Sequence, residues 1–398
     1  MGKKKVMLCM GTRPEIIKMA PLHRALHTIG METVVFHTGQ HREIAMSLYR
    51  LFGITPTVQV DALERKGGSL AELGAALLEQ SHHAIAAQKP DIVLVHGDTS
   101  SALYAALAAF YLEVSIGHVE AGLRTNDPYD PFPEEINRQL IARVARWHFA
   151  PTQGARDSLH AEGIKASAIH RVGNTAVDAA LDVAQRAETN PALVEWPAAL
   201  QGLALSLPGR KLILVTAHRR ENWGRGIDEI AQAASALVDL EPDTIVVWPV
   251  HPNPQVRDTV HAGTAAARQR HPQRLLLSEP LDYACLVAML KRSWLVMTDS
   301  GGIQEEAAAF GTPVLVLRDT TERPELIAQG GGVIVGTDPQ AILGAARPLL
   351  RAAESRATMV AKRNPFGDGS AARRIASILD SSDVHDPGHT RPAELEDY

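Results

Sequence analysis

The hydrophobic and polar positions of the chain follow two alternating patterns. Short apolar runs, typical of buried strands, are separated by longer stretches in which apolar residues recur every three or four positions, as on one face of a helix. Runs separated in this way indicate βαβ units and a parallel sheet. In the first half, strands are predicted at Lys5–Met10, Thr33–Thr38, Asp91–His96, Val114–His118 and Trp147–Ala150, and helices at Pro14–Ile29 and from Thr99 onward.

The same alternation then starts again. The apolar runs of the second half predict strands at Lys211–Thr216, Thr244–Trp248, Arg274–Leu277, Trp294–Thr298 and Pro313–Leu317, with helices at Gly226–Leu240 and Asp282–Lys291. Between the halves, Asn190–Gly209 has little periodicity and is expected to form a loop. Because a single core stops growing at roughly 250–300 residues, a chain of 398 residues is expected to form two domains.

Composition narrows the class of protein. Hydrophobic residues make up 45% and charged residues 21%, as in ordinary soluble proteins, and the formal net charge is −5, which argues against a chain-wide preference for nucleic acid or membranes. No apolar stretch has the roughly 18 residues of a spanning helix, and the first residues lack the features of a signal peptide, so the cytoplasm is the expected location. The two cysteines, Cys9 and Cys285, are expected to be buried free thiols rather than a disulfide or a zinc site.

Two parallel sheets in tandem place the candidate chemistry in the turns that follow the strands, because ligands of such sheets bind outside the carboxyl ends of the strands. After the first strand, Gly11–Glu15 enters a helix whose backbone N–H groups could bind an anion, with Arg13 and Lys18 adding positive charge. A tight turn with a surface arginine is the alternative.

Three carboxylates of the first half have two interpretations each. Asp98 either serves the site or only caps the helix from Thr99. Glu120 is in a position to face a ligand, or it forms an ion pair with Arg124. Glu134, at the end of a proline-rich loop, is either functional or simply favourable charge at a helix start.

The second half has basic and glycine-rich turns. His218, followed by two arginines, suits a polyanionic ligand, and His251 lies between prolines after the next strand. The densest stretch contains Ser300, Gly301 and Gly302 at a helix start, which suits a diphosphate held by backbone N–H groups. Glu305 and Glu306, one turn further on, could accept hydrogen bonds from ribose hydroxyls, and Arg318 and Arg323 follow the next strand.

Ten segments, in order along the chain, resemble segments of the non-hydrolysing UDP-N-acetylglucosamine 2-epimerases. The resemblance extends from about Lys5 to about Ile378 and is carried by GTRPEIIKMAPL, HTGQH, VHGDT, GHVEAGLRT, PFPEEINR, VGNT, TAHRREN, PVHPN, TDSGGIQEEA and RDTTERPE. It implies two Rossmann-like domains as in GT-B glycosyltransferases, with the active site in the cleft between them. The expected divisions are residues 1–175, residues 176–365, a helix at 366–380 that returns to the first domain, and a disordered tail at 381–398.

The resemblance also implies roles for individual residues. The catalytic positions would be Asp98, Glu120, Glu134 and His218. Contacts to the UDP-sugar would come from Arg13, Lys18, His251, Ser300, Gly301, Gly302, Glu306 and Arg323. Gln40 and His41 correspond to a site at which bacterial members bind a second, activating UDP-GlcNAc. The family implies a homodimer that uses no metal and no NAD or other cofactor.

The implied reaction interconverts UDP-GlcNAc and UDP-ManNAc at C2 of the sugar. The proton at C2 is not acidic, because no carbonyl adjoins C2 in the ring, and the family's solution is to eliminate UDP, forming 2-acetamidoglucal, and to add it back. Carboxylates would move the protons and cations would stabilise the departing UDP. The alternatives are a hydrolysing epimerase, an epimerase for a UDP-diacetamido-uronic acid, a GT-B glycosyltransferase and a non-catalytic sensor, which the three carboxylates disfavour.

Overall fold

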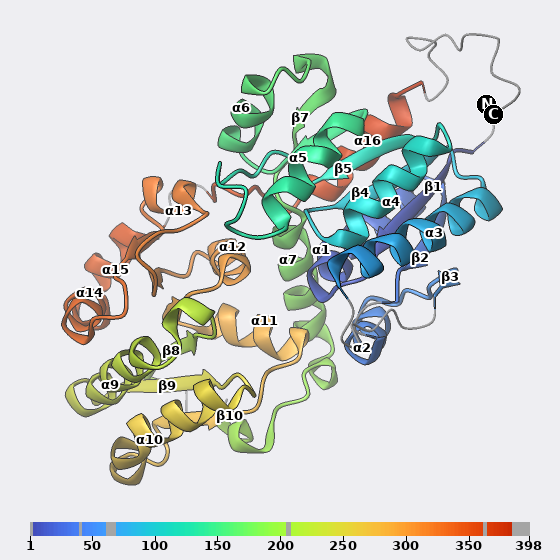
Figure 1. Ribbon diagram of the computed structural model, residues 1–398. Helices are drawn as coiled ribbons and strands as arrows, with labels where there is room; N and C mark the ends of the chain where they lie inside the picture. The colour runs from blue at the N-terminus through green and yellow to red at the C-terminus, as the bar shows by residue number, and fades with distance from the viewer. Residues whose placement is uncertain (1–2, 40–41, 61–68, 204–207, 361–363, 384–398) are drawn as a thin grey trace, which may run out of the picture. The chain divides into compact units, whose positions relative to one another are not determined.

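The chain forms two compact units, each built on one parallel β-sheet (Figure 1). The computed structural model describes residues 3–39, 42–60, 69–203, 208–360 and 364–383. The first unit comprises Met1–Val172 and Ala371–Tyr398, and the second comprises Gly173–Ser370. The predicted α/β class with two parallel sheets is therefore confirmed.

The first unit alternates strands with helices. Its strands are β1 (Lys5–Met10), β2 (Glu32–His37), β3 (Val58–Gln59), β4 (Ile92–His96), β5 (Ser115–Val119), β6 (Trp147–Ala150) and β7 (Ile169–Arg171). Its helices are α1 (Arg13–Thr28), α2 (Arg42–Phe52), α3 (Leu70–Gln88), α4 (Ser100–Tyr111), α5 (Glu134–Val144), α6 (Gln153–Ala161), the 3₁₀ turn η1 (Ala166–Ala168) and α16 (Ala371–Ser381).

The sheet of the first unit has the strand order β3-β2-β1-β4-β5-β6-β7, and every pair is parallel. The order reverses between β1 and β4, which is the point where open α/β sheets bind ligands. Since β1, β4 and β5 are neighbours, the turns after them meet at one edge of the sheet.

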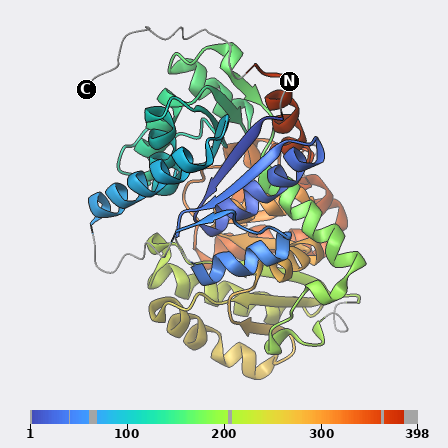
Figure 2. The ribbon, with the colours of Figure 1, turned by 90° about the vertical axis from the view of Figure 1, so that its right-hand side faces the viewer.

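Side chains alternate between the two faces of this sheet. On β1, Met7 and Cys9 pack with residues of α3, α4 and α5, whereas α16 contacts α1. Figure 2 shows the teal helices on one side of the sheet and the red C-terminal helix on the other. Both faces are covered, which explains why the strands appear in the sequence as almost continuous apolar runs.

The second unit repeats this architecture. Its strands are β8 (Lys211–Thr216), β9 (Thr244–Pro249), β10 (Leu275–Ser278), β11 (Leu295–Thr298), β12 (Val314–Val316) and β13 (Gly332–Ile334). Its helices are α7 (Thr175–Thr189), α9 (Arg225–Leu240), α10 (Pro254–Arg270), α11 (Tyr283–Arg292), α12 (Gly301–Ala309), α13 (Pro324–Ala328), α14 (Pro339–Arg351) and α15 (Ala353–Met359), with the 3₁₀ turns η2 (Pro191–Leu193), η3 (Ala198–Leu200) and η4 (Arg220–Asn222).

The second sheet has the order β10-β9-β8-β11-β12-β13, again with parallel pairs throughout. Helices α9, α10 and α14 pack against one face, and α7 contacts α11 and α12. The order reverses between β8 and β11, so the turns after these strands adjoin each other. They contain His218 and the segment from Asp299 to Gly302.

The structure adds three short strands that the apolar pattern did not predict: β3, β7 and β13. Each lies at an edge of its sheet and has two or three residues, too few for a periodicity to show. No helix in the described part of the chain combines the length and the apolar character needed to cross a membrane.

Candidate active site

Three carboxylates predicted to serve the reaction lie near one another in the first unit. Asp98 follows β4, Glu120 follows β5, and Glu134 is the first residue of α5. Burial raises the pKa of the Asp98 carboxyl, and the negative charges of Glu120 and Glu134 raise it further, while the Arg138 guanidinium opposes them. At this edge of the sheet, Glu120 and Glu134 thus lie near Asp98, whose carboxyl retains its proton more readily than usual.

Asp98 does not cap a helix, so that interpretation of the sequence was wrong. The N-cap of α4 is Thr99, whose side chain accepts a hydrogen bond from Ala102 N at 3.0 Å. The Asp98 carboxylate instead accepts a hydrogen bond from Arg138 Nη2 at 2.5 Å, and its carbonyl accepts one from Asn137 Nδ2 at 2.8 Å. Two residues of α5, neither of them predicted from the sequence to serve the site, therefore fix the position of Asp98.

Glu120 is held by Lys18, not by Arg124. The Lys18 ammonium forms an ion pair with the Glu120 carboxylate, and His96 Nε2 lies 3.8 Å from the same oxygen. Arg124 pairs with Glu162, with Nε 2.5 Å from Oε1, so the proposed Glu120–Arg124 pair was wrong. Burial lowers the pKa of His96 to about 4, so the ring next to Glu120 is neutral near pH 7.

The backbone at Glu120 is in the left-handed region, with a φ of 62°. For a residue with a side chain this conformation costs on the order of 1–3 kcal/mol and persists only where the surroundings impose it, most often at functional sites. Gly122 has a φ of 95°, and a Cβ there would lie 2.1 Å from Ala155 O, so its glycine is explained by close packing against the backbone of α6.

The turn after β1 does not offer the anion site that its glycine suggested. The N–H groups of Gly11 and Thr12 both donate to Glu15 Oε2, at 2.9 and 2.6 Å, so a carboxylate of the chain already occupies them. A Cβ at Gly11 would lie 2.0 Å from Thr38 Oγ1, which explains the glycine by packing.

Glu15 is a buried residue that was not predicted from the sequence to belong to the site. Its other oxygen accepts a hydrogen bond from Thr99 Oγ1 at 2.6 Å, which connects the turn after β1 to the turn that contains Asp98. The spacing of Thr12 and Glu15 is that of a capping box, and that pattern could have identified it. Arg13 is the first residue of α1, and its side chain is half-buried.

Glu134 and Glu135 differ although they are neighbours in sequence. Glu135 is fully buried and accepts hydrogen bonds from Thr125 N at 3.0 Å, from Asn126 N at 3.3 Å and from Gln139 Nε2 at 2.8 Å, so it holds the preceding loop. Glu134 is only half-buried, and its charge acts on Asp98. Of the pair, Glu134 is the one available to a ligand.

In the second unit, Asp299 organises the turn that carries His218. Its Oδ2 accepts hydrogen bonds from His218 N and Arg219 N, both at 2.8 Å, and from Asn222 Nδ2 at 3.1 Å. Asp299 is fully buried and follows β11, directly beside β8. Asp299 lies in the motif TDSGGIQEEA, but no role for it was predicted from the sequence. A carboxylate directly after a buried strand was the available signal.

His218 and His251 are stacked. Their ring centroids are 5.7 Å apart and the rings are inclined by 10°. His218 follows β8 and His251 follows the adjacent strand β9, so the register of the sheet brings the two rings together. Two of the predicted site residues therefore form one stacked pair of rings.

The start of α12 leaves backbone donors available. Ser300 is at the N-cap position, but its side chain makes no capping hydrogen bond. The first N–H groups of a helix, here those of Gly301 and Gly302, have no intrahelical acceptor. A Cβ at Gly302 would meet nothing within 4 Å, so packing within the chain does not explain this glycine. Open space beside unpaired donors at a helix N-terminus suits an anion.

The acidic residues of α12 and the basic residues after β12 lie together. Arg323 Nε donates a hydrogen bond to the buried carboxylate of Glu305, which places Arg323 near Gly301. Glu305 is thus engaged within the chain, and Glu306, 8% exposed, is the other carboxylate of this helix. Arg318 pairs with Glu221 at 2.5 Å and joins the turn after β12 to the turn after β8.

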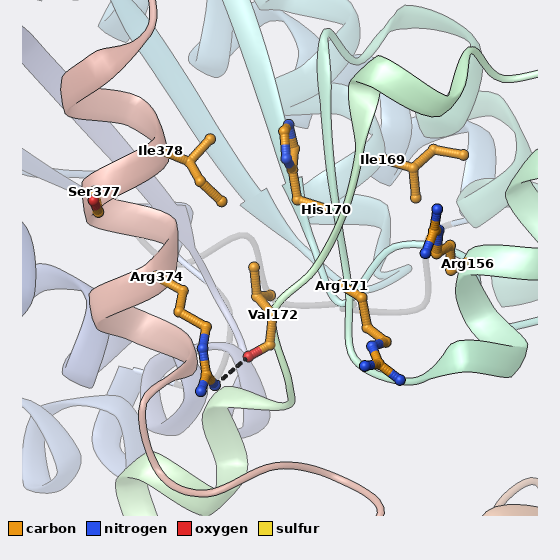
Figure 3. Close-up of a pocket in the computed structure, with 8 residues that line it drawn as sticks. All are labelled: Arg156, Ile169, His170, Arg171, Val172, Arg374, Ser377 and Ile378. Atoms are coloured by element: carbon orange, nitrogen blue, oxygen red, sulfur yellow. Dashed lines mark hydrogen bonds between the residues drawn. The ribbon is translucent and has the colours of Figure 1, made fainter.

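A separate pocket of about 550 Å³ lies between α16, α6 and β7 in the first unit (Figure 3). Arg156, Arg171 and Arg374 line it, and Arg374 Nη1 donates to Val172 O at 3.0 Å. None of the predicted site residues lines this pocket, and it contains no pair of groups for acid–base chemistry.

Gln40 and His41, the candidate activator residues, lie outside the described residues. Within the described ranges, no group of three or more His, Cys, Asp or Glu residues could hold a metal ion.

Comparison with known proteins gives a consistent result. The family model for UDP-N-acetylglucosamine 2-epimerase matches residues 24–380. The UDP-N-acetylglucosamine 2-epimerase of Escherichia coli (strain K12) is 42% identical over 381 residues, which cover 96% of this chain and 99% of that protein.

Two solved structures are similar over almost their whole length. The UDP-GlcNAc 2-epimerase from Neisseria meningitidis, bound to UDP-GlcNAc, is 37% identical with a TM-score of 0.85 and covers 95% of this chain and 100% of its own. A co-structure of Staphylococcus aureus MnaA with UDP is 39% identical with a TM-score of 0.82 and covers 95% and 96%.

Proposed function

Because this chain belongs to the UDP-N-acetylglucosamine 2-epimerase family, we propose that it interconverts UDP-GlcNAc and UDP-ManNAc by eliminating UDP and adding it back. The observation that carries the proposal is the cluster of Asp98, Glu120 and Glu134 at the edge of the first sheet. The relatives support the epimerase activity, and the cluster supports the route by which this chain performs it.

The chemistry requires proton transfers that carboxylates can perform. In the forward direction a base takes the proton from C2 while the bond from C1 to the UDP oxygen breaks, and the electron pair forms the C1–C2 double bond of 2-acetamidoglucal. In the return, a proton is delivered to the opposite face of C2 as the UDP oxygen bonds to C1. Two faces need two groups in different protonation states.

The environments of the carboxylates differ in the required way. Asp98, with its raised pKa, is suited to carry a proton, whereas Glu120 is held in an ion pair by the ammonium of Lys18. Glu134, at the start of α5, completes the set. We assign these three residues the proton transfers at C2.

UDP is assigned to the second unit. The free backbone donors of Gly301 and Gly302 and the guanidinium of Arg323 suit the diphosphate, Ser300 adds a hydroxyl, and Glu306 suits the ribose. We assign His218 and His251 to the leaving phosphate and retain Arg13 as a proposed contact to the UDP-sugar.

Incubation with UDP-GlcNAc alone in D2O tests the proposal. NMR should show UDP-ManNAc with deuterium at C2 and intact UDP-sugars at equilibrium. Free ManNAc and UDP as final products would indicate a hydrolysing epimerase. No change until an acceptor is added would indicate a glycosyltransferase, and turnover only with a UDP-diacetamido-uronic acid would indicate the related epimerase.

We further propose that the chain acts as a cytoplasmic homodimer and that UDP-GlcNAc also activates it through Gln40 and His41. Initial rates should then be sigmoidal in UDP-GlcNAc, and conversion of UDP-ManNAc alone should be slow until a little UDP-GlcNAc is added. A hyperbolic dependence of the initial rate on substrate concentration in both directions would contradict the proposed activation. Light scattering at working concentration tests the dimer.

A further inference from the structure

Three neighbouring strands of the second unit, β8, β11 and β12, end at the same edge of their sheet. The turn after β12 brings the carboxylate of Glu322 to the start of α12. Its Oε2 would lie 3.3 Å from a Cβ placed on Gly301, the first residue of that helix. Its Oε1 accepts a hydrogen bond from Arg318 Nη1 at 3.1 Å. The N-terminus of a helix favours negative charge, so the chain itself places an anionic group beside the helix start to which the diphosphate is assigned.

The same oxygen of Glu322 faces Arg219. Oε2 lies 3.8 Å from Arg219 Nη2, which is an ion pair without a hydrogen bond, and within the described part of the chain no donor forms a hydrogen bond with Oε2. Burial opposes ionisation of Glu322, but the guanidiniums of Arg219, Arg323 and Arg318 outweigh it and hold the pKa of this carboxyl below its ordinary value. The carboxylate is therefore ionised near pH 7, and one of its oxygens is held by charge alone.

The neighbouring ion pairs are shorter. Arg318 Nε lies 2.5 Å from Glu221 Oε1. Arg323 Nε donates a hydrogen bond to Glu305. Each of these guanidiniums thus already has a carboxylate partner within the chain, and a bound diphosphate adds further negative charge beside them. Since its contact with a guanidinium is the longest of these, the Oε2 end of Glu322 is the part of this charge network that a phosphate displaces most readily.

The backbone of Arg219 is fixed, whereas its side chain is only loosely held. Its N–H donates to the buried carboxylate of Asp299 at 2.8 Å, which anchors the residue at the end of β8. Its side chain is 38% exposed and meets Glu322 through the ion pair alone. A guanidinium in this situation can exchange one anionic partner for another, and its planar set of N–H donors suits the oxygens of a phosphate.

We propose that Glu322 sets the affinity for the nucleotide: its carboxylate neutralises Arg219 beside α12 in the free protein and gives way when a phosphate oxygen of UDP takes its place. The inference rests on the proposed function for the assignment of the diphosphate to Gly301 and Gly302. Glu322 lowers the affinity for UDP, because the new contact of Arg219 with phosphate is offset by the loss of an existing ion pair. Weaker uniform binding of the nucleotide keeps the complex from becoming too stable to release its product.

Calorimetry with UDP tests the proposal in Glu322→Gln, a variant that keeps the size of the side chain and removes its charge. The Kd for UDP should fall by about 3- to 10-fold, the effect of removing a partly exposed negative charge beside an anion. Uridine has no phosphate, so its Kd, measured by ligand-observed NMR titration, should change by less than about twofold. An unchanged or weaker affinity for UDP would overturn the proposal, because removing a carboxylate that only orients Arg219 or Arg318 would weaken phosphate binding.

Glu354→Gln is the matched control, because it removes the same charge from an exposed position on α15. Salt screens a distant surface charge, so this variant should keep the Kd for UDP within about twofold of the wild-type value. Equal tightening of UDP in Glu354→Gln and Glu322→Gln would show an effect of net charge and would overturn the proposal. Equal tightening of uridine and UDP in Glu322→Gln would do the same, because the change would then not concern the phosphates.

A double-mutant cycle separates the exchange of partners from simple repulsion. In an Arg219→Gln background, Glu322→Gln has no ion pair with residue 219 to release. Its effect on the Kd for UDP should therefore shrink to about twofold or less. The same tightening in both backgrounds would refute the exchange at Arg219, because Glu322 would then act on the phosphate by repulsion alone.

A crystal structure of the wild-type protein with UDP gives a measurement that does not depend on the folding of any variant. It should show Arg219 in contact with a phosphate oxygen and the Glu322 carboxylate withdrawn from that guanidinium. A complex with the diphosphate at the start of α12 and the Arg219–Glu322 pair intact would refute the proposal.

Binding of UDP is measured without turnover, so the two proposals can fail separately. If the protein does not epimerise UDP-GlcNAc but Glu322→Gln tightens UDP and not uridine, the proposed reaction falls and the role of Glu322 stands. If the protein forms UDP-ManNAc but Glu322→Gln does not tighten UDP, the reaction stands and the role of Glu322 falls.

Discussion

The ammonium of Lys18 and the carboxylate of Glu120 form an ion pair in which each side chain is only 10% exposed. The pair joins α1 to the turn after β5 and fixes a carboxylate whose backbone is strained. A buried pair is costly to break on one side, because the remaining charge has lost its partner.

Removing one partner should therefore destabilise the protein strongly. Lys18→Met and Glu120→Gln should each lower the free energy of unfolding by about 3–5 kcal/mol. The double variant should recover much of this loss but no activity. Urea denaturation and turnover of each variant give the double-mutant cycle. Additive stability losses would mean that the pair does not couple in solution.

The neighbours Glu134 and Glu135 should separate catalysis from stability. Glu134→Gln keeps the size of the side chain and should lower kcat by about 10²–10⁴ while leaving unfolding unchanged. Glu135→Gln disturbs a buried acceptor of backbone N–H groups and should cost about 1–3 kcal/mol of stability. Asp98→Asn and Glu120→Gln should reduce turnover in the same range as Glu134→Gln. Near-normal exchange of the C2 proton with solvent in all three variants would show that these carboxylates have only a structural role.

Gly302 should matter for UDP and not for the fold. A methyl group there meets nothing of the chain within 4 Å, so Gly302→Ala should leave the free energy of unfolding the same or slightly higher. It should weaken UDP binding by about 1–3 kcal/mol, which is about 5- to 150-fold, if a phosphate approaches the backbone. Gly344→Ala, in the middle of α14 and equally open, is the control for calorimetry. Unchanged UDP affinity would contradict the assignment of the diphosphate to this turn.

Buried histidines should give part of the stability a steep pH dependence. Burial lowers the pKa of His118 to about 3, from 6.5 in the unfolded chain. Between these pH values the unfolded state binds more protons than the folded state. The contribution of His118 to the free energy of unfolding is therefore fully present above pH 6.5 and is lost as the pH falls towards 3. One such group contributes a slope of about 1.4 kcal/mol per pH unit near pH 5.

Replacing His118 with Asn should reduce that slope by this amount, measured as the free energy of unfolding in urea at pH 7, 6 and 5. The exposed His160→Asn variant is the control and should keep the wild-type slope. Parallel pH curves for wild-type and His118→Asn protein would show that His118 is protonated or exposed in the folded state.

The sequence by itself determined the strands and the positions after them. An apolar run such as Ile92–His96 is buried on both faces, and this local property is visible without the rest of the chain. Because the strands are parallel, their order also places the turns at one edge of each sheet. The carboxylates after β4 and β5, and the glycines after β11, could therefore be identified as candidates.

Only the tertiary structure decided which groups pair. Glu15 and Thr99 are 84 positions apart, Lys18 and Glu120 are 102 apart, and the backbone of His218 and the carboxylate of Asp299 are 81 apart. From the sequence, Glu120 could pair with Arg124, Asp98 could cap a helix, and the N–H groups of Gly11 and Thr12 could bind an anion. The first two alternatives were excluded by partners from distant segments, Lys18 for Glu120 and Arg138 for Asp98, because such contacts depend on distances that only the packed sheet and helices fix. The third was excluded locally, since Glu15 accepts from the N–H groups of Gly11 and Thr12.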